Sequence, residues 1–126
     1  MKHKLSSKHF SLEPQSLVYL QSEYKEAYKP GARDFEAIAL SPQGNILLTS
    51  EGDMRTTPRI PPRLTEYDRE GQHLRELILP DKFLPEPEGQ QISGVRDNLG
   101  LESLSITPDG KFLFLANEEA LWQDGE

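Results

Sequence analysis

One repeated stretch indicates the fold: Asp34-Phe-Glu-Ala-Ile-Ala-Leu-Ser-Pro-Gln-Gly-Asn-Ile-Leu-Leu48. Its pattern of residue types occurs again in Gly100-Leu-Glu-Ser-Leu-Ser-Ile-Thr-Pro-Asp-Gly-Lys-Phe-Leu-Phe114. Residue 34 aligns with residue 100, and this offset of 66 holds throughout both stretches. Each stretch begins with a β-prone run, reaches a Pro-x-Gly turn and continues as a second apolar run. A self-similar unit of strand, tight turn and strand predicts a repeated all-β module.

The same pattern extends outward from the two turns and predicts six strands. They cover residues 35–40, 46–49, 64–67, 74–79, 99–106 and 112–115, with a loop over residues 80–94. A four-stranded antiparallel meander that begins again after a loop is typical of β-propeller blades. We therefore predict an all-β fold over residues 34–126, a fragment of about one and a half blades of a β-propeller-like structure. Residues 1–33 are expected to be a lead-in, in which Leu17–Leu20 is a candidate outer strand.

The number of units limits what the chain is expected to form alone. Blades bury their faces against neighbouring blades, and a closed propeller has about four to eight of them. We expect this chain of 126 residues to be a fragment of a longer protein, a subunit of an assembly or a small sheet that packs differently. Residues 99–126 are expected to fold only by packing on the first blade or on a second copy, because isolated hairpins are marginal in water.

The amino-acid composition disfavours several classes of binding partner and metal site. The net charge of −7 disfavours nucleic acids and anionic membrane surfaces, which are bound by clustered Lys and Arg. The chain has no cysteine, which excludes disulfides and thiolate metal sites. Its basic N-terminal residues have no apolar run behind them, so no secretory signal is predicted and the chain as written is expected in the cytoplasm.

Acidic and amide side chains gather at one predicted rim. In an antiparallel pair, the first strand begins where the second strand ends, so residues at these two points should meet. The polar residues at these points are Asp34, Glu36, Glu51 and Asp53 in the first unit, and Arg96, Asp97, Asn98, Glu102, Asn117, Glu118 and Glu119 in the second. Converging carboxylates are suited to Ca²⁺ or Mg²⁺ and can also act as acid and base.

A structural interpretation of the same residues stays open. Acidic side chains at strand ends are commonly solvated, and Glu36 and Glu102 would repeat simply because each unit needs a carboxylate to accept backbone N–H groups at its corner. Arg96 beside Asn98 fits an anion clamp, and a surface contact between Arg96 and Asp97 is the alternative.

An ordered set of motifs resembles the phytase-like family, also described as esterase-like activity of phytase. The motifs are Asp34-Phe-Glu-Ala-Ile-Ala, Tyr67-Asp-Arg-Glu-Gly71, Arg96-Asp-Asn-Leu-Gly-Leu-Glu102 and Asn117-Glu118, and the resemblance covers about residues 34–126. It implies a propeller-like all-β fold, hydrolysis of phosphoesters or related esters, and members that are often exported. Family domains are much longer than this chain.

Two functional hypotheses follow. The first is a metal-assisted hydrolase of a small-molecule phosphoester, with Glu36 and Glu102 as catalytic residues. Its substrate would be bound by Arg96 and Asn98, and its Ca²⁺ ion by Asp34, Glu51 and Glu118. The alternative is a catalytically silent β-propeller fragment that acts as an interaction module. Its last strand lacks an outer partner, and that edge would recruit another copy or the missing half of a propeller.

Overall fold

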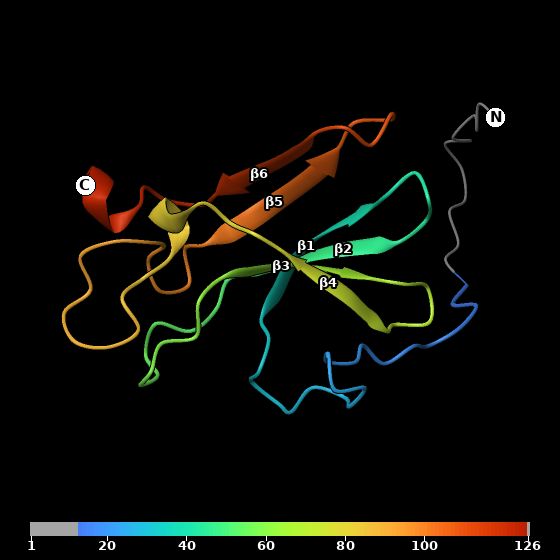
Figure 1. Cartoon of the computed structure of the whole chain (residues 1–126), viewed down its shortest axis with the longest axis horizontal. Coiled ribbons are helices and arrows are strands. Elements are labelled where there is room, and N and C mark those ends of the chain that lie inside the picture. The colour runs from blue at the N-terminus through green and yellow to red at the C-terminus, as the bar shows by residue number, and fades with distance from the viewer. Residues whose placement is uncertain (1–12, 126) are drawn as a thin grey trace.

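The computed structural model describes residues 13–125, in which six strands form two antiparallel sheets (Figure 1). The first sheet has the order β1 (Phe35–Leu40), β2 (Ile46–Ser50), β3 (Arg63–Tyr67) and β4 (His73–Leu77). The second sheet pairs β5 (Leu101–Ile106) with β6 (Leu113–Asn117). Two short 3₁₀ turns, η1 (Asp81–Phe83) and η2 (Trp122–Asp124), complete the described elements. The all-β class and the antiparallel four-stranded meander are confirmed.

The first strand has the predicted bounds, and the other five shift by one or two residues at their ends. The two glycine turns explain this agreement. Gly44 N–H donates to the Ser41 carbonyl over 2.8 Å, and Gly110 N–H donates to the Thr107 carbonyl over the same distance. Both glycines have positive φ angles, +85° and +71°, which a side chain would oppose. The turn residues therefore fix where each strand stops.

The proposed strand at Leu17–Leu20 is wrong. These residues form no strand, and Leu17 and Tyr19 are 82% and 73% exposed. The chain meets the turn between β3 and β4 instead, where Gln21 N–H donates to the Gly71 carbonyl over 2.8 Å. That contact lies beyond the end of the sheet, so no neighbouring strand offers the ladder of hydrogen bonds that an outer strand needs.

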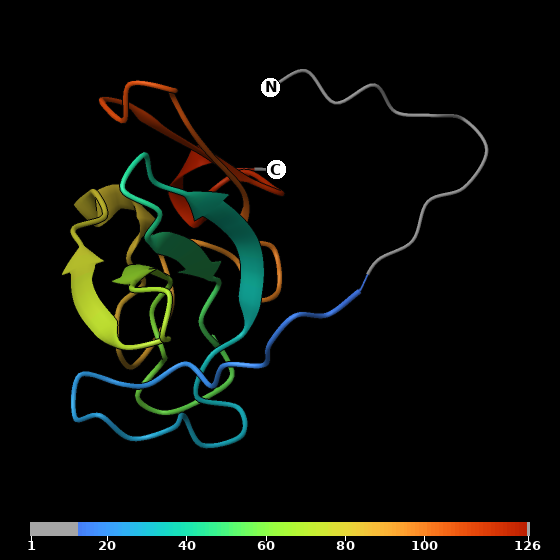
Figure 2. The same ribbon diagram turned by 90° about the vertical axis from the view of Figure 1, so that its right-hand side faces the viewer.

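The segment that follows, up to β1, packs on the first sheet. The Tyr28 and Tyr67 hydroxyls are hydrogen-bonded at 2.9 Å, and Tyr67 is fully buried. The Arg33 guanidinium lies 4.7 Å from the centre of the Tyr28 ring, a cation–π arrangement. Figure 2 shows this segment in blue, passing beneath the first sheet before it enters β1.

One apolar core joins the two sheets. Its buried residues are Leu47, Leu64, Leu79 and Leu101, each 7% exposed or less. Leu101 comes from β5, Leu47 and Leu64 come from the first sheet, and Leu79 follows β4, so the second sheet is held by packing on the first. Burial of one such leucine is worth about 1.5–3 kcal/mol. This agrees with the expectation that residues 99–126 rest on the first unit.

No helix in residues 13–125 has the length and apolar character that crossing a bilayer requires.

Candidate functional site

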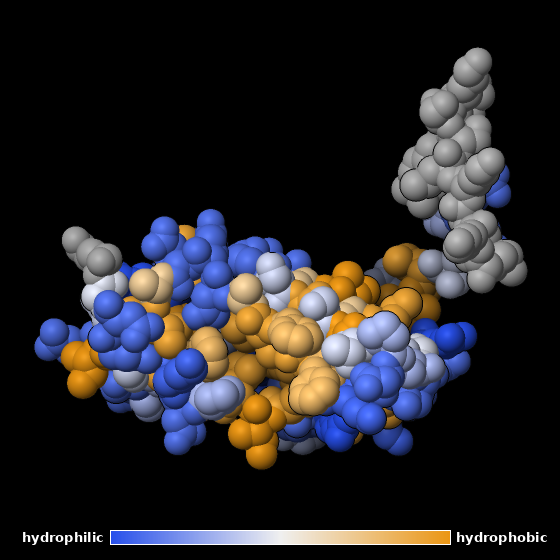
Figure 3. Space-filling model, turned by 90° about the horizontal axis from the view of Figure 1, so that it is seen from above, coloured by the Kyte–Doolittle hydropathy of each residue, from blue (hydrophilic) through white to orange (hydrophobic). Residues whose placement is uncertain are grey.

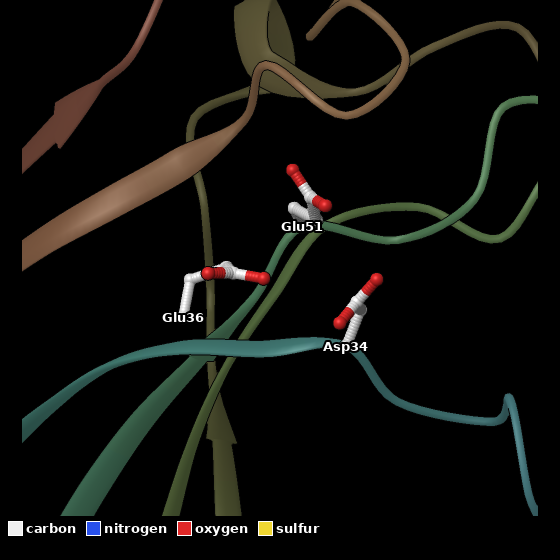
Figure 4. A group of neighbouring side chains, drawn as sticks. All are labelled: Asp34, Glu36 and Glu51. Carbon is white, nitrogen blue, oxygen red and sulfur yellow. The ribbon is translucent and has the colours of Figure 1, made fainter.

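Three carboxylates converge at the rim where β1 begins and β2 ends. Asp34 precedes β1, Glu36 lies within it, and Glu51 follows β2. Each offers a carboxylate oxygen, and these oxygens all lie within 4.8 Å of one another (Figure 4). The antiparallel pairing of β1 with β2 produces this arrangement, because the start of one strand is hydrogen-bonded to the end of the other. The predicted convergence of rim carboxylates is therefore present in the first unit.

A β-bulge places Glu36 in this group. The register of β1 on β2 shifts between Phe35 and Ile38, so Glu36 lies at the irregularity. The Ala37 N–H leaves the ladder and donates to the Thr49 hydroxyl over 2.9 Å. Bulges of this kind redirect side chains near a strand end. Here the redirected side chain is that of Glu36, which joins Asp34 and Glu51 in the cluster.

Glu51 is the buried member of the group, at 5% exposure. Its N–H donates to the Asp34 carbonyl over 3.1 Å, and its carboxylate accepts from the Gly100 N–H over 3.4 Å. A methyl group added at Gly100 would lie 2.8 Å from the Glu51 Cβ, which is closer than such atoms pack. Gly100 aligns with Asp34 in the sequence, so the second unit has a glycine where the first has a carboxylate.

The second unit brings two more carboxylates to the same rim. The register of β5 on β6 shifts between Leu101 and Ser103, which places Glu102 at a bulge as Glu36 is. Glu118 N–H donates to the Gly100 carbonyl over 3.0 Å, as Glu51 N–H does to Asp34. Both carboxylates act electrostatically on Glu36, although neither belongs to the group that converges within 4.8 Å.

Burial and crowding make the charged forms of two of these groups unfavourable. Glu36 is exposed, and partial desolvation at the rim, followed by the charges of Glu102 and Asp34, raises its pKa above its usual range. Burial also raises the pKa of Glu51, where the hydrogen bond from Gly100 acts in the opposite direction and the charge of Glu36 adds to the rise. A bound cation would relieve both effects.

The three convergent side chains fit a divalent cation on geometric grounds. Ca²⁺ is bound by oxygen ligands at about 2.3–2.6 Å, so two ligands of one ion lie no more than about 5 Å apart. The oxygens of Asp34, Glu36 and Glu51 meet that limit. Residues that would hold the ion are thus Asp34, Glu36 and Glu51, whereas Glu118 was predicted in place of Glu36.

Comparison with known families identifies the chain. A model of the family described as "Phytase-like: Esterase-like activity of phytase" matches residues 1–126. The chain belongs to the phytase-like family. The match extends over residues 1–33, which the motifs alone did not include. Neither the curated proteins nor the solved structures contain a match to the chain.

Arg96, one of the two predicted substrate-binding residues of this phytase-like chain, lies beside residues 120–125. Arg96 donates through Nε to the Ala120 carbonyl over 2.9 Å and through a terminal nitrogen to the Gly125 carbonyl over 2.8 Å. Its guanidinium also lies 4.8 Å from the centre of the Trp122 ring. Asn98 is exposed and has a φ of +56° within a tight turn. Arg96 therefore bonds the backbone of Ala120 and Gly125, and Asp97, the alternative partner considered for it, is paired with Arg55.

Arg55 is a cation on this rim that the sequence analysis did not single out. Its guanidinium makes two hydrogen bonds to the Asp53 carboxylate, at 3.0 and 3.2 Å, and lies 3.7 Å from Asp97. Those hydrogen bonds, followed by the charges of Asp53, Asp97 and Asp34, raise the pKa of Arg55. The side chain is nevertheless 75% exposed. The sequence signal is the Asp53-Met-Arg55 segment just beyond β2, in which the Arg55 guanidinium turns back to bond the Asp53 carboxylate.

Proposed function

We propose that this phytase-like chain provides a divalent-cation site for the hydrolysis of small anionic phosphoesters. The observation that carries the proposal is the convergence of Asp34, Glu36 and Glu51 within 4.8 Å of one another. A bound divalent cation would neutralise the phosphoryl oxygens and polarise the phosphorus for attack. The family description, esterase-like activity of phytase, is consistent with this reaction class.

Charge explains why a cation is needed at this rim. The chain carries −7 overall, so an anionic ester would be repelled by the carboxylates unless a cation lay between them. Arg55 is an exposed cationic side chain that contacts Asp53 and Asp97 and is influenced by the charge of Asp34. We assign it the role of orienting the anionic ester. Asn98 stays a proposed secondary contact on the same side of the molecule.

The remaining carboxylates receive different roles in this proposal. Glu36 is a cation ligand, because its oxygens lie with those of Asp34 and Glu51. Glu102 is then the general acid or base, since it occupies the corresponding bulge of the neighbouring sheet and influences Glu36 electrostatically. Glu118 is exposed and would complete the cation's outer environment.

A larger architecture around this site is part of the proposal. We propose that the four-stranded sheet is one blade of a β-propeller and that the β5–β6 hairpin is the inner half of the next. The support is the face-to-face packing of the two sheets through Leu47, Leu64 and Leu101. In such an arrangement the first strands of successive blades approach one axis, and the carboxylates of Glu36 and Glu102 would lie near it.

Hydrolysis of p-nitrophenyl phosphate and p-nitrophenyl acetate tests the proposed activity. We expect turnover of the phosphate ester with Ca²⁺, loss of turnover with chelator, and loss in Glu102→Gln and Glu51→Gln. Glu70→Gln is the matched control, because Glu70 is an exposed glutamate in the turn between β3 and β4. Turnover at the level of buffer alone, with and without Ca²⁺, would contradict the hydrolase proposal for this chain.

A silent interaction module is the second candidate function. Its support is that β5 and β6 form a two-stranded sheet, and no third strand pairs with β6 within residues 13–125. An open edge of this kind is a template for another chain. Inactivity in the ester assays together with capture of a second strand at β6 would favour this function.

A further inference from the structure

The two sheets of this chain pack through unlike faces. Residues directly opposite one another on paired strands share a face, so the register assigns each residue. The inner face of the first sheet carries Ala39 and Leu47, and it meets an inner face of the second sheet. That second inner face is formed by Leu101, Leu104, Ile106, Leu113 and Leu115. One interface between two sheets is therefore already built within the chain.

Within residues 13–125, the opposite faces of the two sheets are open over β1 and over β5 and β6, whereas the segment around Tyr28 covers the first sheet at Tyr67. The outer face of the first sheet carries Ile38, Leu40, Ile46 and Leu48. The outer face of the second sheet carries Ser103, Ser105, Phe114 and Ala116. Ile38, Leu40 and Phe114 are 63%, 62% and 62% exposed. Figure 3 looks at the molecule from the side on which β5 and β6 lie in Figure 1, and it shows apolar side chains gathered across the middle of that surface.

Each outer face corresponds to an inner face of the other sheet. Ile38 and Leu40 of the first sheet align with Leu104 and Ile106 of the second, at the offset of 66 residues. These aligned residues lie on the outer face in the first sheet and on the inner face in the second. The outer face of the first sheet therefore carries apolar residues at the same repeat positions as the inner face of β5 and β6, which packs on the first sheet.

β2 of the first sheet and β6 of the second sheet also correspond to each other, but their residues align at an offset of 67 rather than 66. The first hairpin closes between Ser41 and Asn45 and the second between Thr107 and Phe112, so the second loop is one residue longer. Beyond the turn, Leu47 of the first sheet therefore matches Phe114 of the second. Leu47 is buried in the interface within the chain, whereas Phe114 is exposed on the outer face. The outer face of the second sheet is thus a free counterpart of the inner face of the first.

We propose that these two outer faces bind one another between copies of this chain. The outer face of the second sheet of one molecule would pack on the outer face of the first sheet of the next, repeating the interface within the chain. Both faces are hollowed: a groove of about 150 Å³ lies between Ser103 and Phe114, and one of about 210 Å³ lies between Phe35 and Ile38. Because the two faces differ, the contact is head-to-tail and gives closed rings or open chains.

The residues on the two outer faces and the net charge of each copy predict that the contact between copies is weaker than the interface within the chain. Thr49 bonds across the interface within the chain, and Ala116 stands at the matching position of the outer face without a hydroxyl. Copies that each carry −7 also repel one another, and salt screens that repulsion. We expect a dissociation constant of about a micromolar or weaker, which tightens as salt is raised.

Sedimentation equilibrium of the full chain tests the proposal, and it needs no catalytic activity. The wild type should associate as its concentration rises. Phe114→Glu and Ile38→Glu should each weaken association at least about tenfold, because each replaces an apolar side chain buried in the contact by a charge. An equimolar mixture of the two variants should form a one-to-one dimer and nothing larger, since each retains one intact face. Circular dichroism checks that both variants stay folded.

Ile78→Glu is the matched control, because Ile78 is 98% exposed and lies beyond β4 on neither outer face. It should associate as the wild type does. A wild type that stays monomeric throughout would overturn the proposal, as would a control that also loses association. Failure of the two variants to dimerise when mixed, with each monomeric alone, would overturn the head-to-tail geometry.

Discussion

The hydroxyl of Thr49 in β2 donates a hydrogen bond to the carbonyl oxygen of Leu101 in β5 across 2.9 Å. Thr49 is fully buried, and the same hydroxyl accepts the Ala37 N–H from the bulge in β1. One side chain therefore connects the bulge that positions Glu36 with the first residue of the second sheet. This link holds the two units of the candidate site in one arrangement.

Replacement of Thr49 by valine tests that link. Valine keeps the shape of threonine but leaves the part-buried Ala37 N–H and the buried Leu101 carbonyl without this partner, at a cost of about 2–3 kcal/mol. Thr65→Val is the control, because Thr65 is equally buried but its hydroxyl donates to the part-exposed Glu76 carboxylate and does not bridge the two sheets. Urea unfolding gives both values. Equal losses in the two variants would show that the Thr49 bridge contributes nothing special.

Gly100→Ala should disturb the candidate site directly. The added methyl group would lie 2.8 Å from the Glu51 Cβ, and relief of that overlap should cost about 1–3 kcal/mol of stability. Displacement of Glu51 should also weaken cation binding. Gly89→Ala is the control, because a methyl group at Gly89 meets nothing within 4 Å although its φ is +74°. Calorimetric titration with Ca²⁺ should separate the two variants, and an unchanged affinity in Gly100→Ala would argue against Glu51 as a ligand.

Stability without a cation should depend on the charge state of Glu51. Its pKa is raised in the folded protein, so the folded state holds the proton more tightly than the unfolded state does. The free energy of unfolding should therefore fall as pH rises from 4.5, its ordinary pKa, through the raised pKa of the folded state. In chelator, Glu51→Gln should gain stability relative to the wild type between about pH 4 and pH 7. A difference between the two proteins that does not change with pH would contradict this.

Tyr28→Phe tests whether the segment before β1 stabilises the fold. The substitution leaves the fully buried Tyr67 hydroxyl without the Tyr28 partner at 2.9 Å, and we expect a loss of about 1–3 kcal/mol. Tyr24→Phe, at a residue that is 77% exposed, should change the free energy of unfolding by less than about 0.5 kcal/mol. If chemical denaturation finds both variants equal to the wild type, the segment is not docked as described.

The strands could be predicted because local signals define them. Ser41-Pro-Gln-Gly44 and Thr107-Pro-Asp-Gly110 each combine a turn proline with a glycine at positive φ, and strands lie on either side of both. The docking of Tyr28 on Tyr67 could not be predicted in this way. These residues are 39 positions apart, and the segment around Tyr28 has no periodic pattern.

The sequence predicted which residues lie at the candidate site more readily than it predicted which of their side chains meet. Antiparallel pairing was enough to bring Asp34 and Glu51 to one rim. The inclusion of Glu36 depends on a bulge, which changes the direction of a side chain without leaving a distinct pattern in the sequence. Arg96 was predicted from its neighbour Asn98, but its contacts are with Ala120 and Gly125, more than twenty positions later.

Calorimetric titration of the full chain with Ca²⁺ at neutral pH tests the central claim most directly, that Asp34, Glu36 and Glu51 form a cation site. We predict one binding site with a dissociation constant of about 0.1–1 mM, at the weak end of the range of protein calcium sites. Binding should be lost in Glu36→Gln and Glu51→Gln and kept in Glu70→Gln. No heat of binding up to several millimolar Ca²⁺, or equal binding by Glu51→Gln and the wild type, would contradict the claim.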